Sequence, residues 1–260
     1  MTLSVVIIAK DEERTIGRVL EAVKPIADEM ILVDSGSQDR TKEIALELGA
    51  QCHHQDWLGY AKQKNHALSL AKGDWVLSLD ADEVLSVELV QEIKELLLRE
   101  DATKFDGYKI PRALYIGDTR VAHGGFYPDA QLRLIQSGKG KFNDRMVHEA
   151  IKMDGPVADL KNEMRHYAYK TVDEFSEAMD KYARLSAQEF AKRSKFGWRA
   201  SPLNQLLHPL WTFVYRFVFR KGFLDGLLGL RLATIYSDYI RKKIVYLREI
   251  KDAPGAICGE

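Results

Sequence analysis

The alternation of short apolar runs with amphipathic segments over the first hundred residues constrains the fold more than any other feature of this sequence. Leu3–Ile8, Met30–Val33 and Trp75–Leu79 are apolar runs without the regular polar alternation of a half-exposed strand. Such runs are typical of strands that are covered on both faces. A weaker strand is predicted at Gln51–His54.

Each predicted strand is followed by a segment in which apolar residues recur every three or four positions, as on one face of a helix. The predicted helices cover residues 16–23, 41–48, 60–71 and 87–98. Repeated strand–helix units predict an α/β fold of the Rossmann-like type, with a mostly parallel sheet and helices on both faces.

After residue 105 the pattern changes. Shorter strands are predicted at Gly107–Arg112, Ala130–Ile135 and Met146–Ile151, separated by loops with Gly and Asp. These strands would form an antiparallel extension of the sheet. From Thr171 to residue 250 the spacing is helical, with a break near Gly197–Pro202.

The charge distribution divides the chain into two parts. The formal net charge is zero, but residues 181–250 contain 14 Lys and Arg against four Asp and Glu. The basic part is suited to anionic partners and the acidic part to cations. We therefore expect one domain at 1–168 and a basic, amphipathic helical region at 169–260.

Acidic residues follow three of the predicted strands, at the edge where open α/β sheets bind ligands. They are Asp11–Glu13 after the first strand, Asp34 with Ser35 after the second, and Asp80-Ala81-Asp82-Glu83 after the fourth. Helix capping and the helix dipole explain each group taken singly. Their placement at successive strand ends predicts one shared binding site.

Asp80 and Asp82 are the sharpest pair in this set. In an extended segment, residues i and i+2 project to the same side, so both carboxylates can face one ion. Hard oxygen ligands favour Mg²⁺ or Mn²⁺, which commonly bind substrate phosphates as well. Two uncompensated carboxylates beside a buried strand require a cation. A Mg²⁺ or Mn²⁺ site is therefore predicted.

The runs Val5–Glu13, Ile31–Thr41 and Leu79–Glu83 together resemble family 2 glycosyltransferases, most closely the β-glucosyltransferases that build the core of bacterial lipopolysaccharide. The resemblance implies a GT-A fold and a nucleotide-sugar donor, with UDP-glucose favoured. It also implies a lipopolysaccharide-core or other lipid-linked saccharide acceptor, and inversion at the anomeric carbon.

The resemblance also implies roles for single residues. Asp34 would bind the nucleoside, Asp11 or Glu12 would lie near the base or ribose, and Asp80 would face ribose and metal. Asp82 would be the direct metal ligand. The remaining expected donor-site and metal-site residues are Ala9, Ser35, Lys64, Ala81, Arg133 and His166. In most relatives the first motif reads Asn-Glu-Glu, where this chain has Asp11 before Glu12 and Glu13.

An inverting transferase needs one general base to deprotonate the acceptor hydroxyl. Asp129 and Glu149 are the competing candidates, and we favour Glu149. The neighbouring His148 would orient a side chain or the substrate.

The apolar stretch at 203–219 is interrupted by Arg216 and closed by Arg220 and Lys221. A membrane-spanning helix needs about 20 apolar residues, whereas aromatic residues mixed with cations suit a helix lying in the headgroup layer. Contact with an anionic membrane surface is predicted; a helical hairpin packed on the first domain is the alternative.

The predicted location is the cytoplasm, at the inner face of the cytoplasmic membrane. Cys52 and Cys258 form no disulfide framework. The apolar N-terminal run lacks a preceding basic segment, unlike a signal peptide.

Three other functions fit this sequence less well. A nucleotidyltransferase would have a basic, glycine-rich loop after the first strand, where this chain has Lys10–Glu13. A non-catalytic membrane adaptor would not require three strands that end in carboxylates. Nucleic-acid binding is not expected, because the aromatic residues of the C-terminal region follow helical apolar spacing rather than forming a stacking platform.

Overall fold

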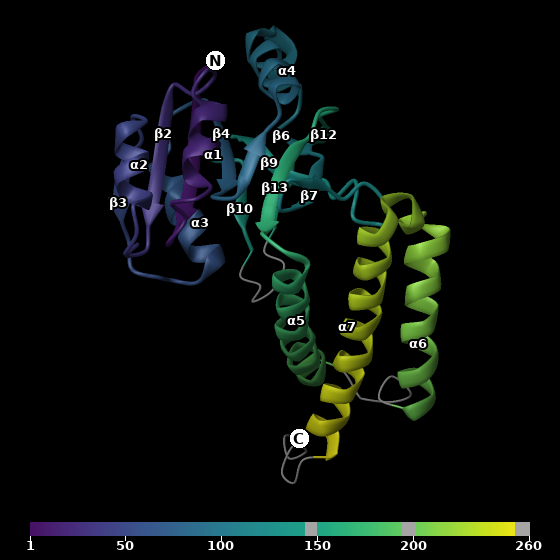
Figure 1. The fold of residues 1–260 in the computed structure, drawn as a ribbon. Helices are drawn as coiled ribbons and strands as arrows, with labels where there is room; N and C mark the ends of the chain where they lie inside the picture. Colours follow the sequence, from purple (N-terminus) through teal and green to yellow (C-terminus); the bar gives the residue numbers. More distant parts are fainter. Residues whose placement is uncertain (144–149, 194–200, 253–260) are drawn as a thin grey trace. The chain divides into compact units, whose positions relative to one another are not determined.

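The computed structural model describes residues 1–143, 150–193 and 201–252. The chain forms two compact units, the first comprising Met1–Leu114 with Pro128–Ala168 and the second comprising Tyr115–Tyr127 with Tyr169–Glu260. Figure 1 shows the helices and strands of both units.

The first unit is built on a seven-stranded sheet of order β12-β6-β9-β4-β1-β2-β3. Its strands are β1 (Leu3–Ala9), β2 (Glu29–Asp34), β3 (Gln51–His54), β4 (Trp75–Asp80), β6 (Gly107–Ile110), β9 (Gln131–Gln136) and β12 (Val157–Asp159). β4, β1, β2 and β3 are parallel neighbours. β9 runs antiparallel to β4 and β6. The predicted parallel α/β sheet with an antiparallel extension is confirmed.

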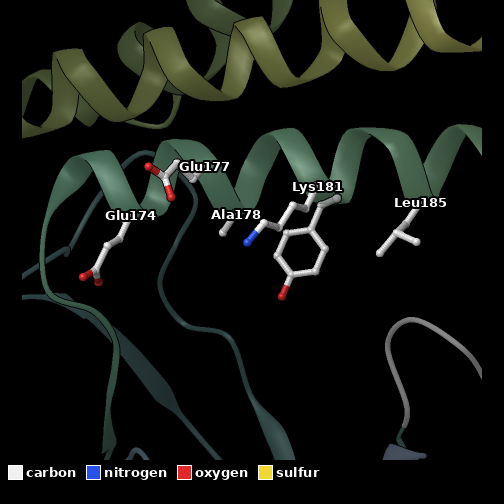
Figure 2. A pocket seen from close by; sticks show the side chains of 6 residues that line it. Glu174, Glu177, Ala178, Lys181 and Leu185 are labelled. Atoms are coloured by element: carbon white, nitrogen blue, oxygen red, sulfur yellow. The ribbon is translucent and has the colours of Figure 1, made fainter.

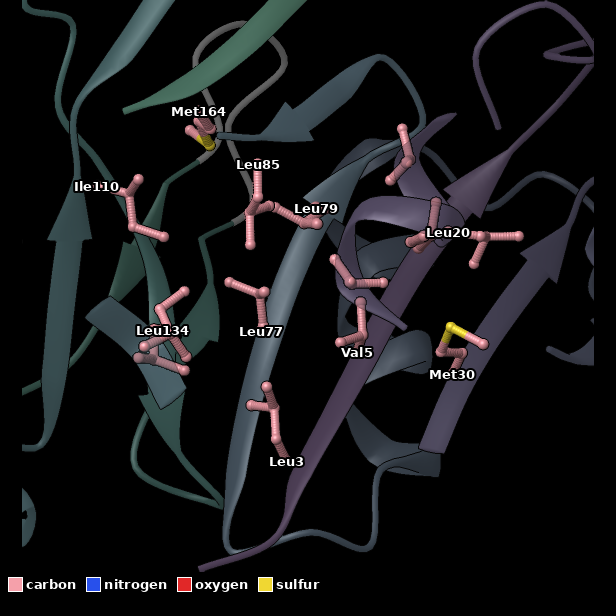
Figure 3. Packing of buried hydrophobic residues seen from close by; sticks show 14 of the residues in the cluster. Leu3, Val5, Leu20, Met30, Leu77, Leu79, Leu85, Ile110, Leu134 and Met164 are labelled. Carbon is pink, nitrogen blue, oxygen red and sulfur yellow. The ribbon is translucent and has the colours of Figure 1, made fainter. Parts of the chain in front are cut away.

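Helices cover both faces of this sheet. They are α1 (Ile16–Val23), α2 (Thr41–Glu47), α3 (Tyr60–Leu70) and α4 (Val87–Leu98), with a short 3₁₀ turn η1 at Glu100–Lys104. Leu3, Val5 and Ile7 of β1 pack in one apolar cluster with residues of α1 and α4 (Figure 3). The intervening Val6 packs in a second cluster with residues of α3. Burial on both faces explains why the strands show no polar alternation.

Several short strands complete the first unit. β5 (Glu83–Leu85) pairs antiparallel with β13 (Met164–Tyr169), and β10 (Lys141–Phe142) with β11 (Ile151–Lys152). β5 and β13 were not predicted from the sequence. Of the strand predicted at Met146–Ile151, residues 146–149 lie outside the described residues.

The strand predicted at Gly107–Arg112 is wrong as a single element, because it divides at Pro111 into β6 and β7 (Arg112–Ile116). Proline has no N–H for a strand ladder, so it ends β6. The second half of β7 forms a hairpin with β8 (Thr119–Arg120) in the second unit.

The other described elements of the second unit are helices. It contains α5 (Val172–Arg193), α6 (Pro202–Val214), a π-helix η3 (Tyr215–Phe219), a 3₁₀ turn η4 (Gly222–Asp225) and α7 (Gly226–Asp252). α7 packs against both α5 and α6 (Figure 1). None of the helices in the described ranges is both long and apolar enough to cross a membrane.

Candidate active site

Asp80 ends β4 and is held between two cations of the protein. Lys64 on α3 places its Nζ 2.6 Å from Asp80 Oδ1, and Arg133 on β9 places its Nη2 2.6 Å from Asp80 Oδ2. Burial would raise the pKa of Asp80, but attraction by Arg133 and Lys64 outweighs it, so the pKa is held well below its usual value. The cation that the sequence argument required beside an enclosed Asp80 is thus supplied, for this carboxylate, by Lys64 and Arg133 of the protein itself.

Glu83, at the start of β5, organises the residues around Asp80. Its side chain is completely buried. Its Oε1 accepts hydrogen bonds from Arg133 Nη2 at 2.7 Å and from Arg112 Nη1 at 3.0 Å, while its Oε2 accepts the backbone N–H of Asp80 at 3.1 Å. Glu83 thus fixes the turn Asp80–Glu83 together with two guanidinium groups. These roles of Glu83 and Arg112 were not predicted from the sequence.

Two opposing effects act on the pKa of Arg133. Burial would lower this pKa, but the attraction of Asp80 and Glu83 raises it by more, so the guanidinium group stays charged. Its Nε–H has no hydrogen-bond acceptor among the residues that the structure describes. Arg133 thus keeps one buried N–H donor without a partner among the described residues.

Asp82 and His166 lie together although they come from distant parts of the chain. Glu83 is paired with His166 in the β5–β13 ladder, and the Tyr167 N–H donates to the Asp82 carbonyl at 2.9 Å. This pairing brings His166 Nε2 to 3.3 Å from Asp82 Oδ2. Both side chains are partly accessible.

The distance between these two atoms fits a pair of metal ligands. Adjacent ligands of an octahedral ion with bonds of about 2.1 Å are separated by about 3 Å. Within the described ranges, no group of three or more His, Cys, Asp or Glu residues converges on a common metal position. Asp82 and His166 are thus an adjacent pair of candidate ligands among the described residues, and a divalent ion held by them could also bind substrate oxygens and water.

The loop after β1 is tied to the loop after β2 by reciprocal hydrogen bonds. Asp11 adopts a left-handed φ of 57°. Its N–H donates to Ser37 Oγ at 2.9 Å, and its Oδ1 accepts the Gln38 N–H at 2.7 Å. The Glu12 N–H donates to Thr41 Oγ1 at 2.7 Å. These bonds give Asp11 a structural role beside the predicted one.

Glu12 carries the perturbed carboxyl group of this loop. Its burial raises its pKa, and repulsion from Asp82 raises it further, while a hydrogen bond from Thr15 Oγ1 at 3.0 Å opposes both effects. Glu12 and Asp82 therefore influence each other electrostatically. Their strands, β1 and β4, are direct neighbours.

Asp34 closes the turn that follows β2. Its carboxylate accepts the Gly36 N–H at 2.9 Å, the Ser37 N–H at 3.1 Å and the Ser37 hydroxyl. Ser35 Oγ accepts from Nε2 of the fully buried Gln63 at 3.0 Å. Gln63 was not identified from the sequence. The role of Asp34 toward a nucleoside stays a prediction.

Of the two predicted general bases, Asp129 lies within the described residues and Glu149 does not. Asp129 Oδ2 is paired with Arg112, and its Oδ1 accepts from Gln131 Nε2 at 2.8 Å. Glu149 and His148 lie outside the described residues. Arg112 thus bridges Asp129 and Glu83, and its pKa is raised by these two carboxylates against the effect of burial.

The three acidic strand ends lie at one edge of the sheet, because β4, β1 and β2 are consecutive neighbours. Ala9 and Ala81 are buried beside these ends. The structure thus brings together Asp80, Asp82, Lys64, Arg133 and His166. Their roles toward a ligand stay predictions.

A recess in the second unit offers a weaker site (Figure 2). All of its lining residues, among them Glu174, Lys181 and Leu185, belong to α5. Glu174 is already engaged, since its Oε2 accepts the Lys170 N–H at 2.7 Å near the start of this helix. The recess therefore lacks the converging charges found around Asp80.

Comparison with known proteins defines the class. The model of glycosyl transferase family 2 matches residues 4–148. The chain belongs to glycosyl transferase family 2, and the resemblance noted in its motifs is confirmed.

Two relatives match nearly the whole chain. An uncharacterized glycosyltransferase of Rickettsia typhi is 30% identical over 95% of this chain and 87% of its own length. The lipopolysaccharide core biosynthesis glycosyltransferase LpsC of Rhizobium meliloti is 28% identical over 98% of this chain and 96% of its own. The solved glucosyl-3-phosphoglycerate synthase of Mycobacterium tuberculosis, in complex with Mn²⁺ and UDP-glucose, is 27% identical over 43% of each chain, with a TM-score of 0.37.

Proposed function

We propose that this glycosyltransferase moves a sugar, with glucose from UDP-glucose favoured, onto a lipopolysaccharide-core or other lipid-linked saccharide, with inversion at the anomeric carbon. The observation that carries the proposal is the meeting of Asp82 and His166 beside the buried cations Lys64 and Arg133. The name of the Rhizobium meliloti relative, a lipopolysaccharide core enzyme, supports the acceptor class.

Asp82 and His166 would hold Mg²⁺ or Mn²⁺, with Asp80 adjacent. A bound divalent ion supplies Lewis-acid stabilisation of the departing diphosphate. Asp80 is placed by Lys64 and Arg133, so we assign it to positioning and to the ribose. Arg133, with its free Nε–H, is the donor best suited to phosphate oxygens.

Asp34, Ser35, Asp11 and Glu12 would line the nucleoside side of the site, together with the buried Ala9. The acceptor hydroxyl would lose its proton to Glu149 or Asp129. We favour Glu149, because both oxygens of Asp129 are engaged by Arg112 and Gln131.

The geometry of the first loop argues against a nucleotidyltransferase. A triphosphate cradle requires free backbone N–H groups. The N–H groups of Asp11, Glu12 and Glu13 donate to the side chains of Ser37, Thr41 and Asp39. They are therefore not available to phosphates.

We also propose that the basic C-terminal region binds an anionic membrane surface and that the enzyme works at the inner face of the cytoplasmic membrane. A water-soluble donor and a lipid-linked acceptor would meet there. The concentration of Lys and Arg in residues 181–250 supports this placement.

A donor screen tests the proposal. The full chain is given UDP-, GDP- and ADP-sugars with Mg²⁺ or Mn²⁺, and release of the nucleoside diphosphate is measured with and without EDTA. Turnover of one donor that EDTA abolishes and added metal restores is the expected result.

Asp82→Asn should lower turnover by about 100-fold or more, since it replaces a charged ligand of the ion that stabilises the leaving group by a weaker, neutral one. Asp56→Asn is the matched control, because His54 Nε2 lies 3.2 Å from Asp56 Oδ1 in a solvent-exposed pair of the same composition. Equal activity of both variants, or turnover that is indifferent to EDTA, would refute the assigned metal ligands.

A further inference from the structure

The second unit exposes a continuous set of large apolar side chains on α6, η3 and the start of α7, which we call the outer face. On α6 and η3 it includes Leu203, Leu206, Leu210, Trp211, Val218 and Phe219. Most of these residues recur at spacings of three or four and so share one side of the helix. The face continues through Leu224 to Leu227, which is 72% exposed. Contiguous apolar surfaces of this kind mark interaction sites.

The inner side of the same helix holds polar residues beside the buried Pro209, whereas the leucines of α6 are all exposed. Asn204 and Thr212 are buried, at 3% and 9% exposure. The guanidinium group of Arg216 lies 3.3 Å from the centroid of the Tyr236 ring and 4.7 Å from that of Phe126, and its Nη1 donates to the Gly124 carbonyl at 2.7 Å. A water-exposed amphipathic helix turns its polar side outward. The outer face therefore matches an apolar environment better than water.

The segment that carries the outer face up to Leu224 has only one sign of charge. Residues 201–224 contain no acidic residue, and besides the inward-facing Arg216 they carry the cations Arg220 and Lys221. The next acid, Asp225, is turned toward His123, with its Oδ1 2.7 Å from His123 Nδ1. A second copy of this chain on the outer face would bring like charges together, whereas anionic headgroups would be attracted.

We propose that the outer face lies in an anionic lipid bilayer, with α6 and η3 parallel to the membrane plane at the boundary between headgroups and acyl chains. A helix of this kind reaches about 5–10 Å into the bilayer. The inference rests on the membrane contact in the proposed function and assigns that contact to particular side chains. Arg220 and Lys221 would face the headgroups, and Trp211 would lie at the boundary.

The test is flotation of the full chain with vesicles of phosphatidylcholine, with and without phosphatidylglycerol. The wild type should bind the anionic vesicles, and salt should weaken the binding. Leu206→Ser combined with Leu210→Ser should weaken it by about tenfold or more, because two apolar contacts are lost. Val87→Ser combined with Leu98→Ser is the matched control, since these α4 residues are 80% and 78% exposed, and it should bind as the wild type does.

Tryptophan quenching gives a second measurement. Lipids brominated on the acyl chains should quench part of the fluorescence of the wild type, and this part should be absent in Trp211→Phe. Unchanged quenching in that variant would overturn the proposed orientation. Circular dichroism of each variant shows whether the fold is retained.

Two further outcomes would overturn the inference. One is equal vesicle binding by the outer-face variant and the wild type. The other is a lipid-free dimer that the outer-face variant dissociates, without vesicle binding, which would assign the face to a second copy. Asp82→Asn should still bind vesicles, so a failed donor screen with intact vesicle binding would refute the proposed function and leave this inference standing.

Discussion

The buried carboxylate of Glu83 sets the positions of two guanidinium groups and one backbone amide. Arg133 and Arg112 both donate to its Oε1, and Asp80 donates its N–H to Oε2. A buried carboxylate is compensated only as long as all of its hydrogen-bond and ion-pair partners are present. Glu83 therefore acts on the ligand site through the residues that it holds.

Replacement of Glu83 by glutamine tests this role. Glu83→Gln leaves Arg112 and Arg133 with one buried anion fewer, and we expect the free energy of unfolding to fall by about 3 kcal/mol. Urea denaturation measures the change. Glu43→Gln, which breaks an exposed pair with Arg40, should leave the unfolding midpoint where it is; an equally small effect of Glu83→Gln would contradict the role.

Single residues also show which features of the site can be predicted from the sequence and which cannot. The acidic groups after β1, β2 and β4 could be identified because strand ends and carboxylates are both visible in the sequence. The neutralisation of Asp80 by Lys64 and Arg133 could not, since it depends on contacts between α3, β4 and β9. The contacts of Glu83 with Arg112 and Arg133 could not be predicted for the same reason, although Glu83 itself belongs to the acidic group after β4.

Among the elements, the short strands β5 and β13 have a large effect on the candidate site. Their antiparallel pairing joins residues 83–85 to residues 164–166 and delivers His166 to Asp82. β5, with three residues, is too short for a periodic signal, and β13, with the sequence Met-Arg-His-Tyr-Ala-Tyr, lacks a continuous apolar run. Longer elements, such as β1, β4 and α4, were predictable because their apolar spacing extends over six residues or more.

In the helical unit, α5 and α7 are joined by a polar cluster at Asp180. Lys242 Nζ lies 3.0 Å from Asp180 Oδ1, and the Tyr246 hydroxyl donates to the same oxygen at 3.1 Å. The hydrogen bond from Lys242 is the main reason that the pKa of Asp180 is lowered, with help from Tyr246 and against a burial effect.

This shift has a defined consequence for stability. Because the pKa of Asp180 is lower in the folded chain, its contribution is present above the unfolded value of about 3.9 and is lost as the pH falls through the folded value. Asp180→Asn should therefore lower the melting temperature at pH 6, and the gap from the wild type should close toward pH 3. Circular dichroism melts across this range measure it.

Asp173→Asn is the comparison for that series, since Asp173 is highly exposed and its contact with Arg231 is 3.5 Å long. The melting temperature of Asp173→Asn should equal that of the wild type at every pH. A gap between Asp180→Asn and the wild type that widens on acidification would show that the sign of the effect is wrong.

On the scale of the whole molecule, the chain passes from one compact unit to the other more than once. Residues 115–127 belong to the second unit, although residues on both sides of them belong to the first. Phe126 packs edge to face with Phe175 and Tyr236, and the Gly124 N–H donates to the Arg220 carbonyl at 2.9 Å. The division at residues 168 and 169 stays a prediction.

A fragment of residues 1–168 tests that division. It would retain residues 115–127 without their partners on η3, α5 and α7, so we expect it to bind a hydrophobic dye and to elute as aggregates in size exclusion. The same fragment with residues 116–126 replaced by a short Gly-Ser linker should elute as a monomer. A monomeric 1–168 fragment that melts cooperatively would contradict the expectation.

The contact between His123 and Asp225 spans 102 positions of the sequence. Synthesis at about 5–20 residues per second separates the appearance of these two residues by on the order of 5–20 seconds. During that interval the nascent chain carries the Gly124–Gly125 loop without its later partners. The contacts of this loop with Arg216, Arg220 and Asp225 therefore form only after translation has passed Asp225, so the order in which the polypeptide emerges from the ribosome sets when they appear.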